Sequence, residues 1–242
     1  FNINGVMDKD SMRFHIASNS IQLTDAVEKF SIDSDNHLKS LSGNGLLDFD
    51  LSINGGTKPT DPIDIACNFS IKDGEIIEPT EKIKLNNIQL LGHYVKRDST
   101  LEELVLKDVR FDSETGPFTG NLSVIDFENP QLKGFAKGTI NLNAAHRIFH
   151  LPEFEKINGH LKVYCDFEAA QNPENELELK RCSGDVSIVN SNFKLENDKR
   201  IFKSVNGNLK FTRRDVRVNQ FSLNVDQSDL ELNGSFSNVF NY

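Results

Sequence analysis

Histidine, cysteine and paired carboxylates are the residue types in this 242-residue chain that could carry chemistry. His146 and His150 are four residues apart, the spacing of two metal ligands on one helix turn, but Arg147 and Ile148 stand where a zinc protease would carry its glutamate. Because no third ligand is in sight, a polar helix face is the better interpretation. The sequence has no glycine-rich phosphate loop and no Gly-x-Ser-x-Gly turn. We therefore expect no enzyme, with no catalytic residue, no metal and no cofactor.

The three cysteines favour buried or inert thiols. Cys67 and Cys165 each alternate with large apolar residues, and on such a strand face a free thiol behaves as a small hydrophobe. Cys182, between Arg181 and Ser183, falls outside that pattern. A bridge between Cys165 and Cys182 across neighbouring strands stays open. The cysteines do not indicate a compartment.

Charge excludes one class of partner. The chain has 36 acidic against 27 basic residues, a net charge of −9, and no lysine or arginine run, which argues against nucleic acid. The carboxylates, such as Asp48 and Asp50, mostly occupy polar strand positions, where solvated surface is the default. No apolar run approaches the roughly 20 residues of a membrane helix. Since the chain opens on Phe1 rather than methionine, we interpret it as part of a longer protein whose targeting or anchoring segment lies elsewhere.

Alternating hydrophobicity predicts an all-β fold. Residues 47–53 and 221–225 have apolar side chains at every second position and polar ones between, so each strand has one apolar and one polar face. One short helix is expected over residues 144–151, ended by Pro152. The 26 asparagines and 15 glycines are expected mostly in turns, where positive φ is needed.

A repeat of the form Gly-x-apolar-x-apolar indicates a regular architecture. Copies begin at Gly120, Gly138, Gly159, Gly184 and Gly207, in steps of 18, 21, 25 and 23 residues. A unit of this length is too short for a strand–helix–strand crossover, which needs about 30 residues. It predicts one antiparallel hairpin per repeat, with two strands of about nine residues each.

The hairpins must cover their apolar faces. The sheet could pack on a second sheet, close as a barrel, or curl into a groove that holds a ligand. The apolar stripes that would form the core or line the groove are Leu161, Val163, Phe167, Val186, Ile188, Phe193, Leu195, Leu209, Phe211, Phe221, Leu223, Val225, Leu230 and Leu232.

The C-terminal residues carry a likeness to a known family. The segment Ser-Asp-Leu-Glu-Leu-Asn-Gly-Ser-Phe at 228–236 resembles the late strand pair of AsmA-like proteins of the Gram-negative envelope, as do Leu142-Asn143 and Ile157-Asn-Gly159 before it. The resemblance covers residues 130–242 well and residues 35–130 only through the repeat pattern.

The resemblance implies a single continuous β-repeat domain over residues 1–242. Such proteins, related to TamB and to eukaryotic bridge-like lipid-transfer proteins, are thought to curl β-repeats into a long groove with an apolar floor. An N-terminal helix, absent here, would anchor the full-length protein in the inner membrane, and the β part would lie in the periplasm. The implied role is to bind or conduct phospholipid or other acyl-chain lipid toward the outer membrane, with envelope proteins as further partners. The family has no catalytic residues, so its functional surface would be the apolar stripes.

Two other hypotheses remain. The chain could be a structural or adhesive β-sandwich that binds a protein or glycan, or a piece of an outer-membrane barrel. It contains 18 phenylalanines, three tyrosines and no tryptophan. Sugar stacking normally recruits tryptophan and tyrosine, and membrane barrels carry aromatic girdles, so this composition favours an apolar core or an acyl-chain surface over both.

Overall fold

The computed structural model describes residues 2–24, 42–58, 60–78, 83–97, 101–149, 151–172 and 177–239. The elements with described bounds are β1 (Asn2–Met7), β2 (Ser11–Gln22), β3 (Ser42–Gly56), β4 (Ile63–Glu78), β5 (Ile83–Arg97), β6 (Leu101–Ser113), β7 (Gly116–Ile125), β8 (Gln131–Asn141), α2 (Leu142–Phe149), β9 (Phe154–Gln171), β10 (Leu177–Leu195), β11 (Phe202–Arg213), β12 (Asp215–Val225) and β13 (Ser228–Phe236).

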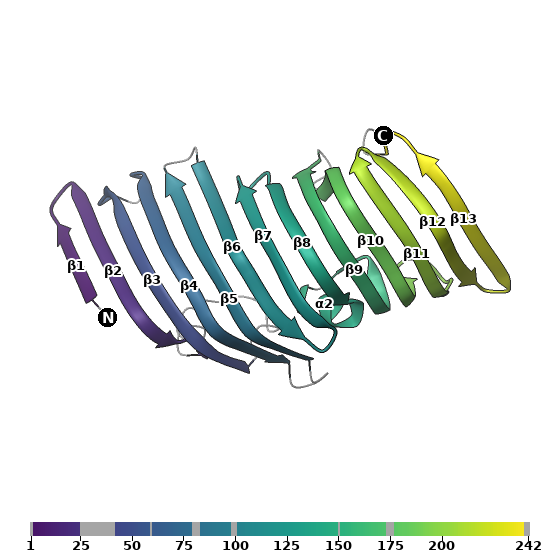
Figure 1. Ribbon diagram of the computed structural model, residues 1–242. Coiled ribbons are helices and arrows are strands. Elements are labelled where there is room, and N and C mark those ends of the chain that lie inside the picture. Colours follow the sequence, from purple (N-terminus) through teal and green to yellow (C-terminus); the bar gives the residue numbers. More distant parts are fainter. Residues whose placement is uncertain are drawn as a thin grey trace. The chain divides into compact units, whose positions relative to one another are not determined.

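The strands form one antiparallel sheet in which each strand pairs with its sequence neighbours, in the order β1 to β13 (Figure 1). Helix α2 is the one helix with described bounds. The predicted fold class, an all-β curled sheet of repeated antiparallel hairpins, is therefore confirmed.

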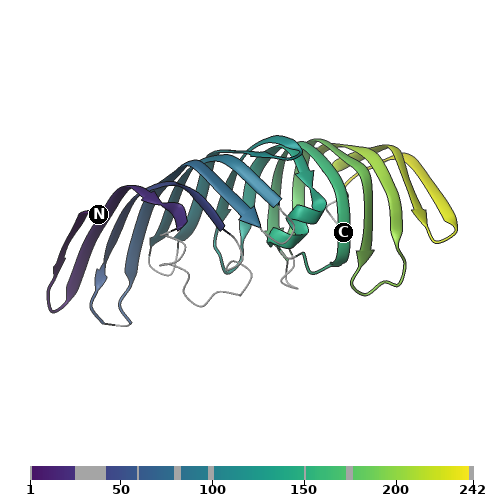
Figure 2. The same ribbon diagram turned by 90° about the horizontal axis from the view of Figure 1, so that it is seen from below.

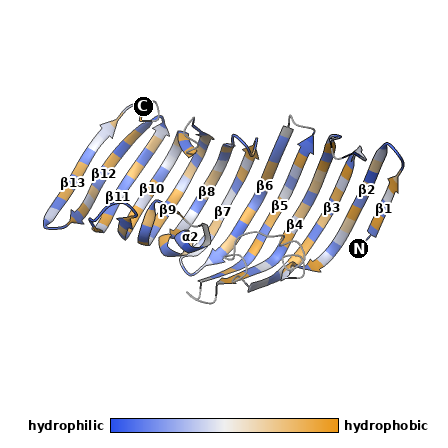
Figure 3. Cartoon of the chain, turned by 180° about the vertical axis from the view of Figure 1, so that it is seen from behind, coloured by the Kyte–Doolittle hydropathy of each residue, from blue (hydrophilic) through white to orange (hydrophobic). Residues whose placement is uncertain are grey.

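The chain divides into two compact units. Unit 1 comprises Phe1–Glu114 and Thr119–Lys133, and unit 2 comprises Thr115–Phe118 and Gly134–Tyr242. In both units, hydrophobic and hydrophilic residues alternate along the strands (Figure 3), as the period of two requires when one face is apolar.

In unit 1, directly paired residues build apolar rows across the strands. One row crosses β2 to β6 through Ile16, Leu51, Cys67, Tyr94 and Leu104, each opposite the next. Residues that are directly opposite in an antiparallel pair point to the same face. The row therefore forms a continuous band perpendicular to the strands.

Most strands contain a β-bulge whose residue has positive φ. In unit 1 these residues are Ser20, Asp73, Asn87 and Asp108, with φ between 51° and 58°. In unit 2 they are Asn190, Ser204 and Gln220, with φ between 47° and 51°. The pairing register shifts at each of them. A bulge adds one unpaired residue and bends its strand, and the strands of each unit are visibly bent along their length (Figure 2).

At four of these bulges, those of Ser20, Asn190, Ser204 and Gln220, the backbone N–H that leaves the ladder donates to a side-chain acceptor on a neighbouring strand. The N–H of Ser20 donates to Oδ1 of Asp48 at 2.7 Å, and the N–H of Gln220 donates to Oδ1 of Asn233 at 2.6 Å. The hydrogen bond from Ser20 is also the main reason that the pKa of Asp48 lies below its usual value, with Lys72 as the second cause. Short polar side chains thus satisfy donors that would otherwise be unpaired.

Two expectations about the repeat are wrong. Strands β9 and β10 have 18 and 19 residues, and Gly159, Gly184 and Gly207 lie in three successive strands. One repeat is therefore one long strand with its turn, not a hairpin of two short strands. These glycines also lie within strands rather than in turns. The neighbouring strand approaches them so closely that a side chain would not fit, since a Cβ on Gly207 would be 2.7 Å from the ring of Phe221.

Helix α2 begins two residues before the predicted segment. Its first turn is capped by Asn141, whose Oδ1 accepts a hydrogen bond from the N–H of Ala144 at 3.2 Å. The helix packs against β9 and lies on the concave side of the strands of unit 2 (Figure 2).

Candidate functional site

The candidate site is the concave apolar face of unit 2, which we call the inner face. It is built from rows of directly paired residues across β9 to β12, and its central row runs through Val163, Val186, Leu209 and Val218. The row ends at Gly234 on β13. Five strands at about 4.8 Å spacing give this row a width of about 19 Å.

The register places every stripe residue predicted from the sequence on this one face. The remaining members pair within rows or continue the same alternation, and they are Leu161, Phe167, Ile188, Phe193, Leu195, Phe211, Phe221, Leu223, Val225, Leu230 and Leu232. The stripes from successive strands therefore join into one surface rather than facing opposite ways.

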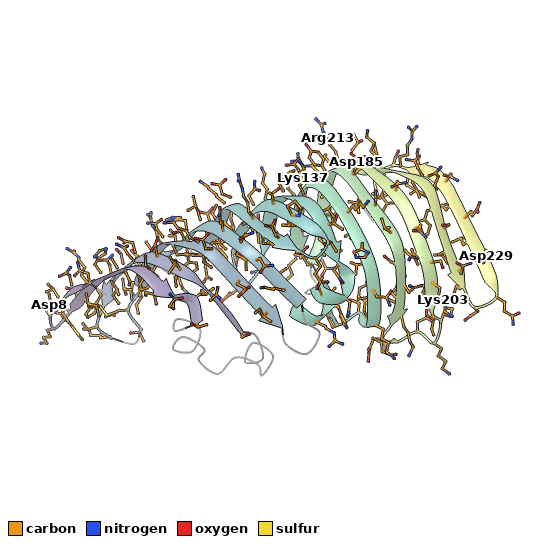
Figure 4. All side chains as sticks on the ribbon, turned by 60° about the horizontal axis from the view of Figure 1, so that its bottom comes forward. Asp8, Lys137, Asp185, Lys203, Arg213 and Asp229 are labelled. Atoms are coloured by element: carbon orange, nitrogen blue, oxygen red, sulfur yellow. The ribbon has the colours of Figure 1, made fainter. Side chains whose placement is uncertain are left out.

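The opposite, outer face of unit 2 is polar. Asp185 pairs directly with Tyr164, and Nζ of Lys137 lies 5.7 Å from the centre of the Tyr164 ring. Lys137 and Asp185 project outward from the convex side of the strands (Figure 4). Arg181 and Glu168, a directly opposed pair of β10 and β9, form an ion pair at 2.9 Å. The charges thus lie on the side away from the inner face.

The inner face is only partly covered. Val163 is 9% exposed and Val205 only 2%, whereas Leu230 and Leu232 on β13 are 49% and 38% exposed. Most other stripe residues are half-buried. Among the described elements, α2 is the one helix that packs on a strand of this unit, and it contacts β9. The inner face is therefore neither a filled core nor a fully exposed surface.

Sequence reasoning missed several inner-face residues because the bulges change the phase of alternation. On β12, Val216 and Val218 lie on the inner face before the bulge at Gln220, and Phe221 and Leu223 lie on it after the bulge. An uninterrupted period of two would place these two pairs on opposite faces. Other inner-face residues that were missed are Phe154, Ile157, Ala169, Phe202 and Val205.

An aromatic cluster closes the inner face near the turn between β10 and β11. The rings of Phe193 and Phe202 stack with centroids 4.7 Å apart, and Phe154 meets Phe193 edge-on at 5.9 Å. The guanidinium of Arg200 lies 5.6 Å from the centre of the Phe202 ring and is held by Asp198. The hydrogen bonds from Arg200 lower the pKa of Asp198 to about 2.

The inner face also holds two of the cysteines as free thiols. Cys165 and Cys182 are both buried, so Cys182 does share the apolar face, contrary to the prediction from its neighbours Arg181 and Ser183. The register shift on β10 between Leu179 and Arg181 changes the phase there and explains the error.

No metal centre is found in the part of the chain that the structure describes, where no three histidine, cysteine or acidic side chains come together. His146 lies on α2, and His150, four residues further along the chain, is outside the described residues. The same described residues contain no helix that is both long and apolar enough to cross a membrane.

Comparison with protein-family models, with curated proteins and with solved structures finds no match to this chain.

Proposed function

We propose that the inner face of unit 2 binds the acyl chains of phospholipids or of similar lipids. The observation that carries this proposal is the continuous apolar band from β9 to β13. Its side chains are half-buried, and none of the described elements forms a second sheet that covers it. A binding role fits this face better than a catalytic one, because it presents hydrocarbon side chains and very few reactive groups.

The dimensions of the inner face suit an acyl chain. Its central row is about 19 Å wide, and the hydrocarbon of one membrane leaflet is about 15 Å thick. A chain laid across the strands would contact valine, leucine and phenylalanine along its whole length. Each buried methylene contributes about 0.8 kcal/mol, so about ten buried methylenes match the roughly 8.2 kcal/mol of micromolar binding. The further methylenes of a phospholipid's two acyl chains offset the cost of immobilising the lipid.

The distribution of polarity also supports a lipid. Charged side chains such as Lys137 and Asp185 lie on the outer face of unit 2, where they stay hydrated. A phospholipid needs the same division, with apolar contact for its chains and water for its headgroup. Apolar contacts are non-directional, so a chain can slide along the face without one tight position.

The likeness of residues 130–242 to AsmA-like proteins extends this proposal to a cellular role. On that basis we propose a periplasmic segment of an inner-membrane-anchored protein that passes phospholipid toward the outer membrane.

The proposal is tested by site-specific photo-crosslinking of the intact chain in phosphatidylethanolamine and phosphatidylglycerol vesicles. A photoreactive phenylalanine analogue replaces Phe211 on the inner face or, as the matched control, Tyr164 on the outer face of the same unit. We expect lipid adducts from position 211 and none from position 164. Equal yields from both positions, or none from either, would contradict the proposal, and the absence of lipid would favour a structural interaction module instead.

A further inference from the structure

Two thiols lie side by side on the inner face, on neighbouring strands. Cys165 of β9 is directly opposite Gly184 of β10, and Cys182 of β10 is directly opposite Phe167 of β9. Cys165 and Cys182 are therefore diagonal neighbours on the same face, and the Cys182 thiol donates a hydrogen bond to the sulfur of Cys165.

The backbone of β10 lies close to β9 beside the pair, as it does at other strand glycines such as Gly159. A Cβ on Gly184 would lie 2.7 Å from the Cα of Cys165 and 2.0 Å from the carbonyl oxygen of Tyr164, and Gly184 has φ of +138°. The absence of a side chain at this position lets β10 approach β9 beside Cys165. Close strand approach is what a bond between diagonal cysteines requires, because diagonal neighbours in a regular ladder are usually somewhat too far apart.

We propose that Cys165 and Cys182 form a reversible intrachain disulfide when a low-molecular-weight disulfide such as oxidised glutathione is supplied. The two residues are 8% and 3% exposed, so bulky protein thiols are kept away from the pair, and a small disulfide reaches Cys165, the more exposed of the two. This modification site is independent of the proposed lipid binding, since it needs only the pairing of β9 with β10.

The reaction proceeds by two thiol–disulfide exchanges. The Cys165 thiolate attacks one sulfur of oxidised glutathione, forming a mixed disulfide and releasing one glutathione thiolate. Cys182 then loses its proton, and its thiolate attacks Sγ of Cys165 and expels the second glutathione thiolate. The two released thiolates take up the two protons, so two protein thiols are oxidised while one glutathione disulfide is reduced to two thiols.

Exposure sets this order, because Cys165 is 8% exposed and Cys182 only 3%, and the hydrogen bond within the pair acts in the same direction. Donation from Cys182 lowers the pKa of Cys165 to about 7, while the same hydrogen bond and burial raise the pKa of Cys182. Since the thiolate is the nucleophile, Cys165 attacks first and Cys182 resolves the mixed disulfide.

The test is incubation of the intact, fully reduced chain with oxidised glutathione, followed by alkylation of remaining thiols and mass mapping. We expect a loss of two hydrogens and a peptide linked through Cys165 and Cys182, reversed by dithiothreitol. The bridge should raise the thermal midpoint by several degrees, because it restricts the unfolded chain. Full alkylation of both residues after prolonged exposure would overturn the proposal, as would a link through Cys67.

Single variants test the order of attack. We expect C182S to accumulate a stable glutathione adduct on Cys165, and C165S to leave Cys182 unmodified under the same conditions. C67S is the matched control, since Cys67 lies on β4 in unit 1, and it should still form the bridge. An adduct on Cys182 in C165S at the rate seen for Cys165 in C182S would contradict the assigned roles.

Discussion

The backbone N–H of Asn190 on β10 donates a hydrogen bond to Oδ1 of Asn206 on β11 at 2.7 Å. The same two strands make the reciprocal contact, because the N–H of Ser204 on β11 donates to Oδ1 of Asn192 on β10 at 2.9 Å. Asn190 and Ser204 are the bulge residues of their strands. Each strand thus satisfies the donor that the bulge of its neighbour leaves unpaired.

Removing one of these acceptors should weaken unit 2. We expect Asn206→Ala to lower the free energy of unfolding by about 1 kcal/mol, the usual net value of one hydrogen bond. The side chain of Asn206 also donates to the carbonyl of Ser204 at 2.8 Å, so Asn206→Asp, which keeps only the acceptor, should lose less. The measurement is equilibrium unfolding in urea.

The control for this change is Asn54→Ala on β3, an exposed strand asparagine that caps no bulge. It should change the free energy of unfolding by less than about 0.5 kcal/mol. If Asn54→Ala and Asn206→Ala cost the same, the bulge contact has no special weight.

Adding a methyl group at Gly184 should be costly. Its φ of +138° disfavours any L side chain, and the added Cβ would meet the backbone of Tyr164 and Cys165, which cannot rotate away. We expect Gly184→Ala to lower the free energy of unfolding by about 2 kcal/mol or more. Gly234→Ala is the matched control, because its Cβ would be 3.7 Å from the ring of Phe236. A control variant as unstable as Gly184→Ala would contradict this explanation.

Alkaline titration should single out Tyr94. Burial, and then the hydrogen bond from its hydroxyl to Oε1 of Glu102 at 2.7 Å, raise the pKa of Tyr94 from 10.0 to about 12. Because the fold favours the neutral phenol, this contribution to stability is complete below pH 10 and is lost as the pH rises through about 12. Phenolate absorbance is easily read in a chain with three tyrosines and no tryptophan.

Two variants assign that titration. Tyr94→Phe should remove the ionisation near pH 12, and Glu102→Gln should move it to lower pH, since the neutral amide no longer repels the phenolate. If the ionisation near pH 12 persists in Tyr94→Phe and stays at the same pH in Glu102→Gln, another tyrosine accounts for it.

The strand faces could be predicted from the sequence because alternation needs only local pattern. The runs around Val163, Leu209 and Leu223 were each assigned their apolar side correctly, and the structure joins them in one face. Strand length could not be predicted, because glycine is typical of turns. Gly159 and Gly184 instead lie within long strands, at points where the neighbouring strand comes close. Whether such a glycine lies in a turn or within a strand depends on the residues of the neighbouring strand, and the sequence of one strand does not specify them.

The sequence predicted only some of the inner-face residues, for a related reason. A bulge inserts one extra residue into a strand and shifts the alternation by one position. It is hard to recognise in the sequence when the inserted residue is Ser204 or Gln220 rather than glycine. Val218, which is 6% exposed, was missed because the bulge at Gln220 puts it out of phase with Phe221 and Leu223. Val205, which is 2% exposed, keeps the phase of Leu209 and was missed although no bulge separates the two residues. The sequence likewise did not decide whether Cys165 and Cys182 are neighbours, because that depends on the register between β9 and β10.

The bulges have a consequence for how such a chain can change in length. Most strands carry their own bulge, and each described strand pairs only with its sequence neighbours, so its place in the ladder does not depend on a distant strand. Duplicating or deleting two consecutive strands would restore the same up-and-down direction and leave every remaining pairing intact. The sheet is thus modular, and its extent can be tuned two strands at a time without redesigning the surface it presents.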